Sequence, residues 1–268
     1  MLRKLLKYEL LATARVFGAC YLGLAALSLL AGLSMNFPAT SNNIVGGILL
    51  TAYICMLFAV MLFTFLTIIR RFYQNLLGGE GYLMNTLPVH AWQLVTSKLI
   101  AALVWAAASI IMAGASFFLL TFASISSAPI LLASIGEIFN QLSHLPLYFE
   151  ASTGTSFWMF LFQMLVLLLV EGISSICRLY TSCMVGHQFR RWRVAASIIA
   201  YFLISFAVSA LMDLIPWIDA SEGVLFVEGE GFIHFSSRFW ALLPTEAVLG
   251  ALFFAVTSYL LEKRLNLD

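Results

Sequence analysis

Six long apolar stretches dominate the chain, separated by shorter polar or mixed segments. An α-helix needs about 20 residues to cross a hydrocarbon core about 30 Å thick, so each stretch is long enough to span a membrane. The fourth stretch exceeds a simple crossing and is expected to protrude at one end. The pattern predicts an all-α polytopic membrane protein with a single transmembrane domain over residues 1–268. The predicted spans are residues 17–35, 44–69, 99–123, 157–187, 194–215 and 240–261.

The first 15 residues have a different pattern from the spans. Their leucines fall near one helical face, and Arg3, Lys4 and Lys7 fall largely on another. A helix of this kind lies in the headgroup layer rather than across the membrane. We therefore expect residues 1–15 to form an interfacial amphipathic helix.

Two segments outside the spans are long enough to carry structure of their own, residues 124–155 and 216–239. Within the first, residues 129–143 have the spacing of a short amphipathic helix. Within the second, residues 224–235 read as two short strands around a Gly-rich turn. Pro244 then suits the first turn of the last helix. We expect a small structured exterior segment before the last span.

Basic residues set the orientation, because loops rich in Lys and Arg stay in the cytoplasm. All of them except Arg238 fall on one side of a six-span arrangement. This places both termini and the 70–98 loop inside, as expected of a multi-pass protein of the cytoplasmic (inner) cell membrane. The exterior loops are acidic. Exclusion of basic residues explains that bias more simply than a mouth that attracts cations. The basic residues on the cytoplasmic side are Arg3, Lys4, Lys7, Arg15, Arg70, Arg71, Lys98, Arg178, Arg190, Arg191, Arg193, Lys263 and Arg264.

Composition supports the same class of protein. The chain has 62% hydrophobic and only 10% charged residues, whereas soluble proteins average about 25% charged. Lipid must therefore cover much of the surface. The four cysteines lie within apolar stretches without metal-type spacing, which favours helix packing over disulfides.

Motifs for catalysis are missing. The sequence has no HExxH, no adjacent pair of glutamates, and no Gly-Lys pair followed by Ser or Thr, as a phosphate-binding loop requires. We therefore expect no catalytic residue, metal site or cofactor in this chain, and no nucleic-acid partner. If ATP drives the protein, another polypeptide hydrolyses it.

Ionisable residues inside the spans are few, and such residues are costly and often functional. Glu171 lies deep in the fourth stretch, whereas Asp213 and Glu246 fall near predicted span ends. Arg178 follows Glu171 by two turns and shares its helix face, which is a long reach for a direct pair. A structural role between helices and a proton relay both remain open for these residues.

The loop over residues 70–98 has the most informative pattern. It is too apolar for a solvated linker, and its glycines and Pro88 divide it into short pieces. Such a loop forms short helices with an apolar face. Docking of a cytoplasmic partner and contact with lipid explain that face equally well.

This loop resembles the coupling region of bacterial permeases of type-2 ATP-binding-cassette (ABC) exporters. The resemblance rests on Arg70-Arg71, Glu80-Gly81-Tyr82-Leu83, Thr86-Leu87-Pro88-Val89 and Ser97-Lys98. A second patch, residues 180–189, is similar to the end of the fourth span in that family. The layout of the whole chain matches, but the motifs cover only about 45 residues.

The resemblance implies a permease subunit that moves an amphipathic substrate outward, such as a peptide, a drug or a lipid-like molecule. It implies a cytoplasmic ATPase partner that binds ATP and Mg, and a second permease subunit, identical or related. Small residues that allow close approach of helices cluster in the first and third spans, and both packing within one subunit and contact between two subunits remain open for them. They are Ala14, Gly18 and Gly23, and Ala106 to Ala108 with Ala113 to Ala115. The residues implied in coupling to the ATPase are Arg70, Arg71, Glu80, Gly81, Tyr82, Pro88 and Lys98.

Two other functions are open, a secondary transporter and a membrane scaffold without transport activity. A secondary transporter typically gathers charged groups and discontinuous helices at mid-membrane. The sequence shows neither clustered mid-membrane charges nor discontinuous helices, which argues against a secondary transporter. The sequence contains nothing that excludes a scaffold.

Overall fold

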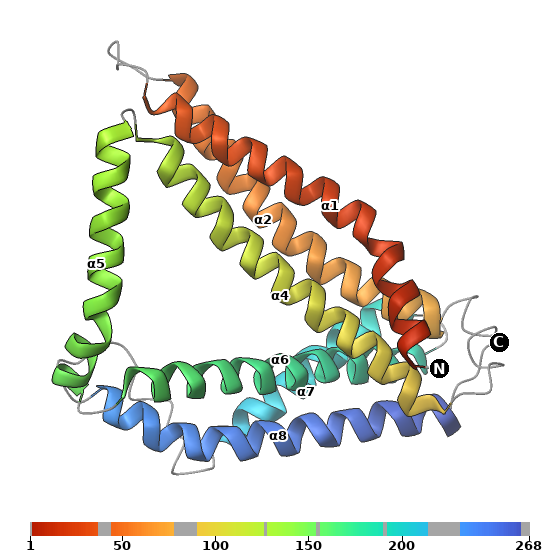
Figure 1. Cartoon of the computed structure of the whole chain (residues 1–268). Helices are drawn as coiled ribbons and strands as arrows, with labels where there is room; N and C mark the ends of the chain where they lie inside the picture. Colours follow the sequence, from red (N-terminus) through yellow and green to blue (C-terminus); the bar gives the residue numbers. More distant parts are fainter. Residues whose placement is uncertain are drawn as a thin grey trace. The chain divides into compact units, whose positions relative to one another are not determined.

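A computed structural model describes residues 2–36, 44–77, 90–125, 128–153, 156–189, 192–213 and 231–263. These residues form helices, and none of them lies in a strand. The elements are α1 (Leu2–Ser34), α2 (Ile44–Phe72), the π-helix η1 (Tyr73–Leu77), α4 (Ala91–Ala123), α5 (Ala128–Thr153), α6 (Phe157–His187), α7 (Arg193–Asp213) and α8 (Gly231–Lys263) (Figure 1).

Six of these helices are long and apolar enough to cross a membrane, and they correspond one to one with the predicted spans. The prediction of an all-α polytopic membrane protein is confirmed. The candidate spans are Leu6–Ser34, Ile44–Phe72, Ala91–Ala123, Phe157–His187, Arg193–Met212 and Leu242–Glu262.

Helix α1 runs without a break through residue 15, where the sequence predicted a boundary between an interfacial helix and a span. Its 33 residues make a rod about 50 Å long at about 1.5 Å per residue. The hydrocarbon core is only about 30 Å thick. Part of α1 therefore extends beyond the core, and its basic first turns suit the headgroup layer.

The exterior segments differ from the predictions in extent and type. The helix expected over 129–143 is longer and forms α5. The strands expected over 224–235 are wrong for residues 231–235, which belong to α8, whereas residues 224–230 lie outside the described part. Alternation of polar and apolar residues over so short a stretch also fits one edge of a helix.

Pro244 lies inside α8 rather than in its first turn. A proline has no N–H to donate to the carbonyl four residues earlier, which here is that of Trp240. The helix continues because its other backbone groups bond within it, as burial in lipid demands.

The chain divides into two compact units. Unit 1 comprises Met1–Arg70 and Ile100–Gln141, and unit 2 comprises Arg71–Leu99 and Leu142–Asp268. The boundaries between the units fall inside α2, α4 and α5, so each of these three helices contributes to both.

In unit 1, α1, α2 and α4 lie side by side (Figure 1). Phe17 of α1 stacks on Trp105 of α4 at 4.2 Å between ring centroids. Farther along, the Tyr21 hydroxyl contacts the Ser109 hydroxyl at 2.8 Å. Both pairs have the same sequence separation of 88, so α1 and α4 run parallel.

Helix α2 runs antiparallel to α4 and bonds to two of its serines, Ser109 and Ser116, which we call the polar stripe of α4. Thr64 contacts Ser109 at 2.7 Å, and Tyr53, nearer the start of α2, contacts Ser116 at 3.1 Å. Ser109 thus bonds to both α1 and α2. Hydroxyls that bond across helices are a usual device of membrane bundles, where lipid competes with apolar contacts.

In unit 2, α6 packs against both α7 and α8. The backbone and side chain of Ser174 on α6 lie against Gly250 of α8, and Thr181 contacts Thr257 at 2.9 Å. The two pairs share a sequence separation of 76, so α6 and α8 run parallel. Gly186 packs closely on Ser197 of α7. Each unit therefore holds three consecutive crossings of alternating direction.

Candidate functional site

Aromatic rings join the base of the predicted cytoplasmic loop to α6 within unit 2. Phe72, the last residue of α2, stacks on Tyr180 of α6 with ring centroids 3.9 Å apart. The Tyr180 hydroxyl donates a hydrogen bond to the backbone carbonyl of Lys98 at 3.3 Å. Tyr73 meets His187 edge to face at 5.9 Å. We call Phe72, Tyr73, Tyr180 and His187 the aromatic clamp.

The clamp fixes both ends of the loop to one helix. Phe72 and Lys98 lie near the two ends of the predicted 70–98 loop, which are helical because α2 continues to Phe72 and α4 begins at Ala91. Tyr180 contacts both residues. Tyr180 is only 2% exposed and Phe72 is fully buried. Because a stacked pair of buried rings is a well-packed contact, a displacement of the loop ends must also displace α6.

The π-helix η1 begins immediately after Phe72 and covers Tyr73–Leu77. Single-turn π-helices are rare and occur frequently at functional sites. Here the wider turn follows Phe72 directly and lies within the segment that the sequence marked as the coupling loop, residues 70–98. Leu76 of η1 is fully buried.

The structure places three of the seven predicted coupling residues. Arg70 is exposed and Arg71 is half-buried at the end of α2, whereas Lys98 is 5% exposed. Lys98 is therefore a buried residue of the loop base and not a surface contact for a partner. The other four, Glu80, Gly81, Tyr82 and Pro88, lie outside the described residues.

Sequence reasoning missed Phe72 and the role of Tyr180. Phe72 fell within the predicted 70–98 loop and belonged to none of the motifs that marked the loop. Tyr180 stood in the patch 180–189 that carried the family resemblance, but neither spacing nor composition linked it to a residue more than 80 positions earlier. Proximity in space is the signal, and one sequence does not contain it.

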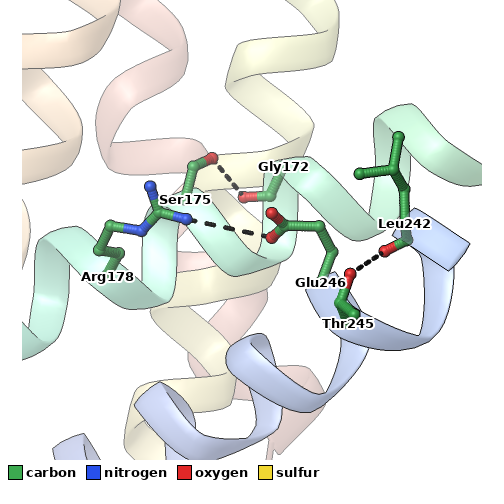
Figure 2. Close-up of polar contacts among 6 residues, drawn as sticks. All are labelled: Gly172, Ser175, Arg178, Leu242, Thr245 and Glu246. Carbon is green, nitrogen blue, oxygen red and sulfur yellow. Dashed lines mark hydrogen bonds and ion pairs between the residues drawn. The ribbon is translucent and has the colours of Figure 1, made fainter. Parts of the chain in front are cut away.

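A second group of residues brings charges together inside the spans of unit 2. Arg178 Nη2 of α6 lies 4.0 Å from Glu246 Oε2 of α8, and their side chains are 14% and 10% exposed (Figure 2). The Arg178 guanidinium also lies 5.9 Å from the centroid of the Phe253 ring, which allows a cation–π contact. Glu171 interacts electrostatically with both Glu246 and Arg178 and makes a side-chain contact with Glu246.

The sequence predicted that Glu171 and Arg178 share a helix face and that two turns is a long reach between them. The structure agrees with that geometry and supplies another partner for Arg178, which is Glu246 on α8. The sequence showed no clustered charges, whereas the structure brings Glu171, Arg178 and Glu246 close together. We call these three residues the charged cluster.

The register of α6 and α8 decides which residues of the two helices lie at the same level along the helix axes. Glu171 lies near the middle of α6. Because Ser174 packs against Gly250, Glu246 lies one turn before that level, beside Glu171. Glu246 is only 8% exposed, although it lies near the start of the candidate span Leu242–Glu262, as the sequence predicted. Arg178 had been counted at the cytoplasmic end of its span, but it lies two turns inside.

Three buried polar atoms around the cluster have no hydrogen-bond partner among the described residues. They are Ser174 Oγ, Arg178 Nε and Glu246 Oε2. Nearby hydroxyls do not serve them, since Ser175 bonds the Gly172 carbonyl at 3.2 Å and Thr245 bonds the Leu242 carbonyl at 2.8 Å (Figure 2). An unsatisfied buried polar group costs about 1–3 kcal/mol. The cluster is therefore polar and incompletely satisfied.

Within the described residues, no group of three or more His, Cys, Asp or Glu side chains has the placement to hold a metal ion. No protein-family model, no curated protein and no solved structure matches the chain. The aromatic clamp and the charged cluster are therefore the observations on which a function rests.

Proposed function

We propose that the chain is the membrane-spanning permease subunit of an ABC exporter. It moves an amphipathic substrate outward, and a separate cytoplasmic ATPase subunit binds ATP and Mg and hydrolyses the ATP. Two permease subunits, identical or related, pair with two ATPases. The complex lies in the cytoplasmic membrane of a bacterium, with both termini of this chain in the cytoplasm.

The observation that carries the proposal is the aromatic clamp. A permease driven by a separate ATPase needs a cytoplasmic element that is pushed and a rigid connection from that element to a transmembrane helix. Tyr180 contacts residues at both ends of the 73–97 segment, and α6, which carries Tyr180, packs on both other helices of its unit. Movement of the loop therefore reaches three spans.

The motif residues support the same proposal from the sequence. Glu80 is flanked by glycines and Pro88 follows it in the loop, so the sequence predicts an acidic group on a short, bent segment. An acidic side chain in such a place pairs well with an arginine of a partner. We assign Glu80, Gly81, Tyr82 and Pro88 to the docking surface, and Arg70, Arg71 and Lys98 to its base.

The charged cluster favours a second candidate, a secondary transporter driven by an ion gradient. Charged groups at mid-membrane mark ion or proton pathways in many transporters. The two candidates differ in their source of energy. An exporter permease needs its ATPase, whereas a secondary transporter works alone.

Copurification and ATP hydrolysis test the proposal directly. The chain is co-expressed with a stand-alone ABC ATPase encoded beside it and purified in mild detergent. We expect a complex whose ATP hydrolysis is lowered by Glu80→Arg, with unchanged membrane insertion. The matched control is Glu137→Arg, since Glu137 is exposed on α5, on the predicted exterior side.

Two results would reject the exporter. One is failure of the permease to retain the ATPase in any mild detergent. The other is transport in vesicles that continues without ATP and stops when ionophores collapse the ion gradients. The latter result would establish the secondary transporter.

A further inference from the structure

The charged cluster lacks one positive charge. It holds two carboxyl groups, Glu171 and Glu246, and one guanidinium, Arg178. Among the described side chains of α6, α7 and α8, the other charged groups lie close to the helix ends. Arg178 therefore balances only one of the two carboxylates, and the second is neutralised only when it binds a proton or another cation.

Glu171 is the carboxyl group without a positively charged partner among the described side chains, because Arg178 pairs with Glu246. The Glu171 side chain is exposed, whereas that of Glu246 is nine-tenths buried. An ionised carboxylate at the centre of a membrane helix costs about 2.5–3.5 kcal/mol or more. A cation beside Glu171 removes that cost. Lipid tails alone do not, so the exposed face of α6 around Glu171 is a poor surface for contact with hydrocarbon.

Two buried groups mark the same place independently. Ser174 lies one turn after Glu171 on the same face of α6, is fully buried, and its hydroxyl has no hydrogen-bond partner among the described residues. Glu246 Oε2 is also buried and without such a partner. Unsatisfied acceptors beside an exposed carboxylate suit a ligand that brings positive charge or N–H groups.

The surroundings of Glu171 are apolar. Leu168 and Met164 precede it by one and two turns on the same face of α6, and they are 57% and 47% exposed. A ligand with a cationic group at Glu171 would therefore lay an apolar body along Leu168 and Met164. Methionine adapts its shape to varied apolar partners, which suits such a surface.

We propose that Glu171, with Ser174 and Glu246 behind it, binds the positive group of a monocationic amphiphile whose apolar part lies along Leu168 and Met164. Arg178 holds Glu246 and leaves Glu171 for the ligand. This inference rests on the proposed function, because it names the class of molecule that the permease carries.

The test measures binding of tetraphenylphosphonium, a monovalent amphipathic cation, to the purified full chain in an uncharged detergent by equilibrium dialysis. Tetraphenylborate, an anion of similar size and shape, is the comparison ligand. We expect Glu171→Gln to weaken binding of the cation about tenfold or more and to leave binding of the anion unchanged or stronger. Glu171→Asp should retain most of the affinity.

Arg178→Gln gives the opposite sign, because it removes a positive charge from the site. It should strengthen binding of tetraphenylphosphonium and weaken binding of tetraphenylborate. A purely structural role for the cluster predicts that both substitutions change the two ligands alike. Glu150→Gln is the control, since Glu150 is an exposed acidic residue of α5 outside the spans.

Equal affinity of wild type and Glu171→Gln for tetraphenylphosphonium would overturn the proposal, whatever the affinity of Arg178→Gln for that ligand. So would equal binding of the cation and the anion by the wild type. The assay contains neither ATP nor ATPase, so its failure leaves the exporter proposal standing. Loss of the ATPase complex, in turn, leaves the binding result intact.

Discussion

The ring of Tyr180 lies on the ring of Phe72, with centroids 3.9 Å apart and planes within 9° of parallel. Phe72 ends the second candidate span and Tyr180 lies in the fourth. Stacking of two fully buried rings contributes roughly 0.5–1.5 kcal/mol beyond the apolar area they bury. This contact makes the end of α2 and the last turns of α6 one packed element, and it is the basis of the first prediction.

Tyr180→Ala should lower the stability of the protein by about 3–5 kcal/mol, the range for removing a large aromatic side chain from a core. Tyr180→Phe keeps the stack and loses the long hydrogen bond to the Lys98 carbonyl, so it should cost about 1 kcal/mol. Thermal unfolding in detergent, followed by tryptophan fluorescence, measures both. Tyr259→Ala is the control, because Tyr259 is 54% exposed. A loss of stability that is equal for Tyr180→Ala and Tyr259→Ala would contradict the role of the clamp.

Ser109→Ala should destabilise unit 1 by about 1 kcal/mol. The Ser109 hydroxyl contacts both Tyr21 and Thr64, and an interhelical hydrogen bond in a membrane protein contributes about 0.6 kcal/mol on average. Thr51→Ala removes only an exposed bond to the Gly47 carbonyl and should change little. The midpoint of thermal unfolding distinguishes the two variants. Identical midpoints would show that the polar stripe of α4 does not hold the helices together.

Gly18→Leu tests the predicted pairing of two permease chains. A Cβ atom at Gly18 meets nothing within 4 Å, whereas one at Gly23 meets Met56 Cε at 3.1 Å. Gly23 thus packs within the chain, and Gly18 is the better reporter of a second subunit. We expect Gly18→Leu to reduce the dimer fraction in native mass spectra while monomer stability is kept.

Gly114→Leu is the matched control for that experiment, since a Cβ atom at Gly114 also meets nothing within 4 Å. Gly114 lies on an exposed part of α4. If Gly18→Leu and Gly114→Leu leave the same dimer fraction, α1 does not form the contact between subunits. A single permease chain in the active complex would remove the paired arrangement altogether.

Cysteine labelling tests the orientation. Cysteines at Glu150 and Glu228 should react with an impermeant thiol reagent in intact cells, and one at Gln74 should not, because basic loops stay inside. In every variant the four native cysteines, Cys20, Cys55, Cys177 and Cys183, are replaced by alanine. Permeabilised cells are the positive control, in which Gln74→Cys should react with the reagent. Labelling of Gln74→Cys in intact cells would reverse the orientation.

Much of the fold followed from hydrophobicity alone. A lipid environment demands about 20 apolar residues in each crossing and internal bonding of every backbone group, so all six spans were predicted from the sequence. The errors in the predicted elements concern segments outside the candidate spans, and residues 231–235 are the clearest of them. Residues 231–235 continue a helix through Pro244, where a local pattern suggested strand and turn.

The sequence by itself determined the class of protein, the number of spans, and the face of α6 that carries Glu171 and Arg178. Only the tertiary structure decided that Arg178 faces Glu246 and that Tyr180 contacts Phe72 and Lys98. Helical periodicity states which residues share a face of one helix. It does not state which helix lies opposite, because apolar helices in lipid have no hydrophobic preference among neighbours. That choice depends on small residues and polar contacts such as Ser174 against Gly250 and Thr181 with Thr257, which set the parallel register of α6 and α8.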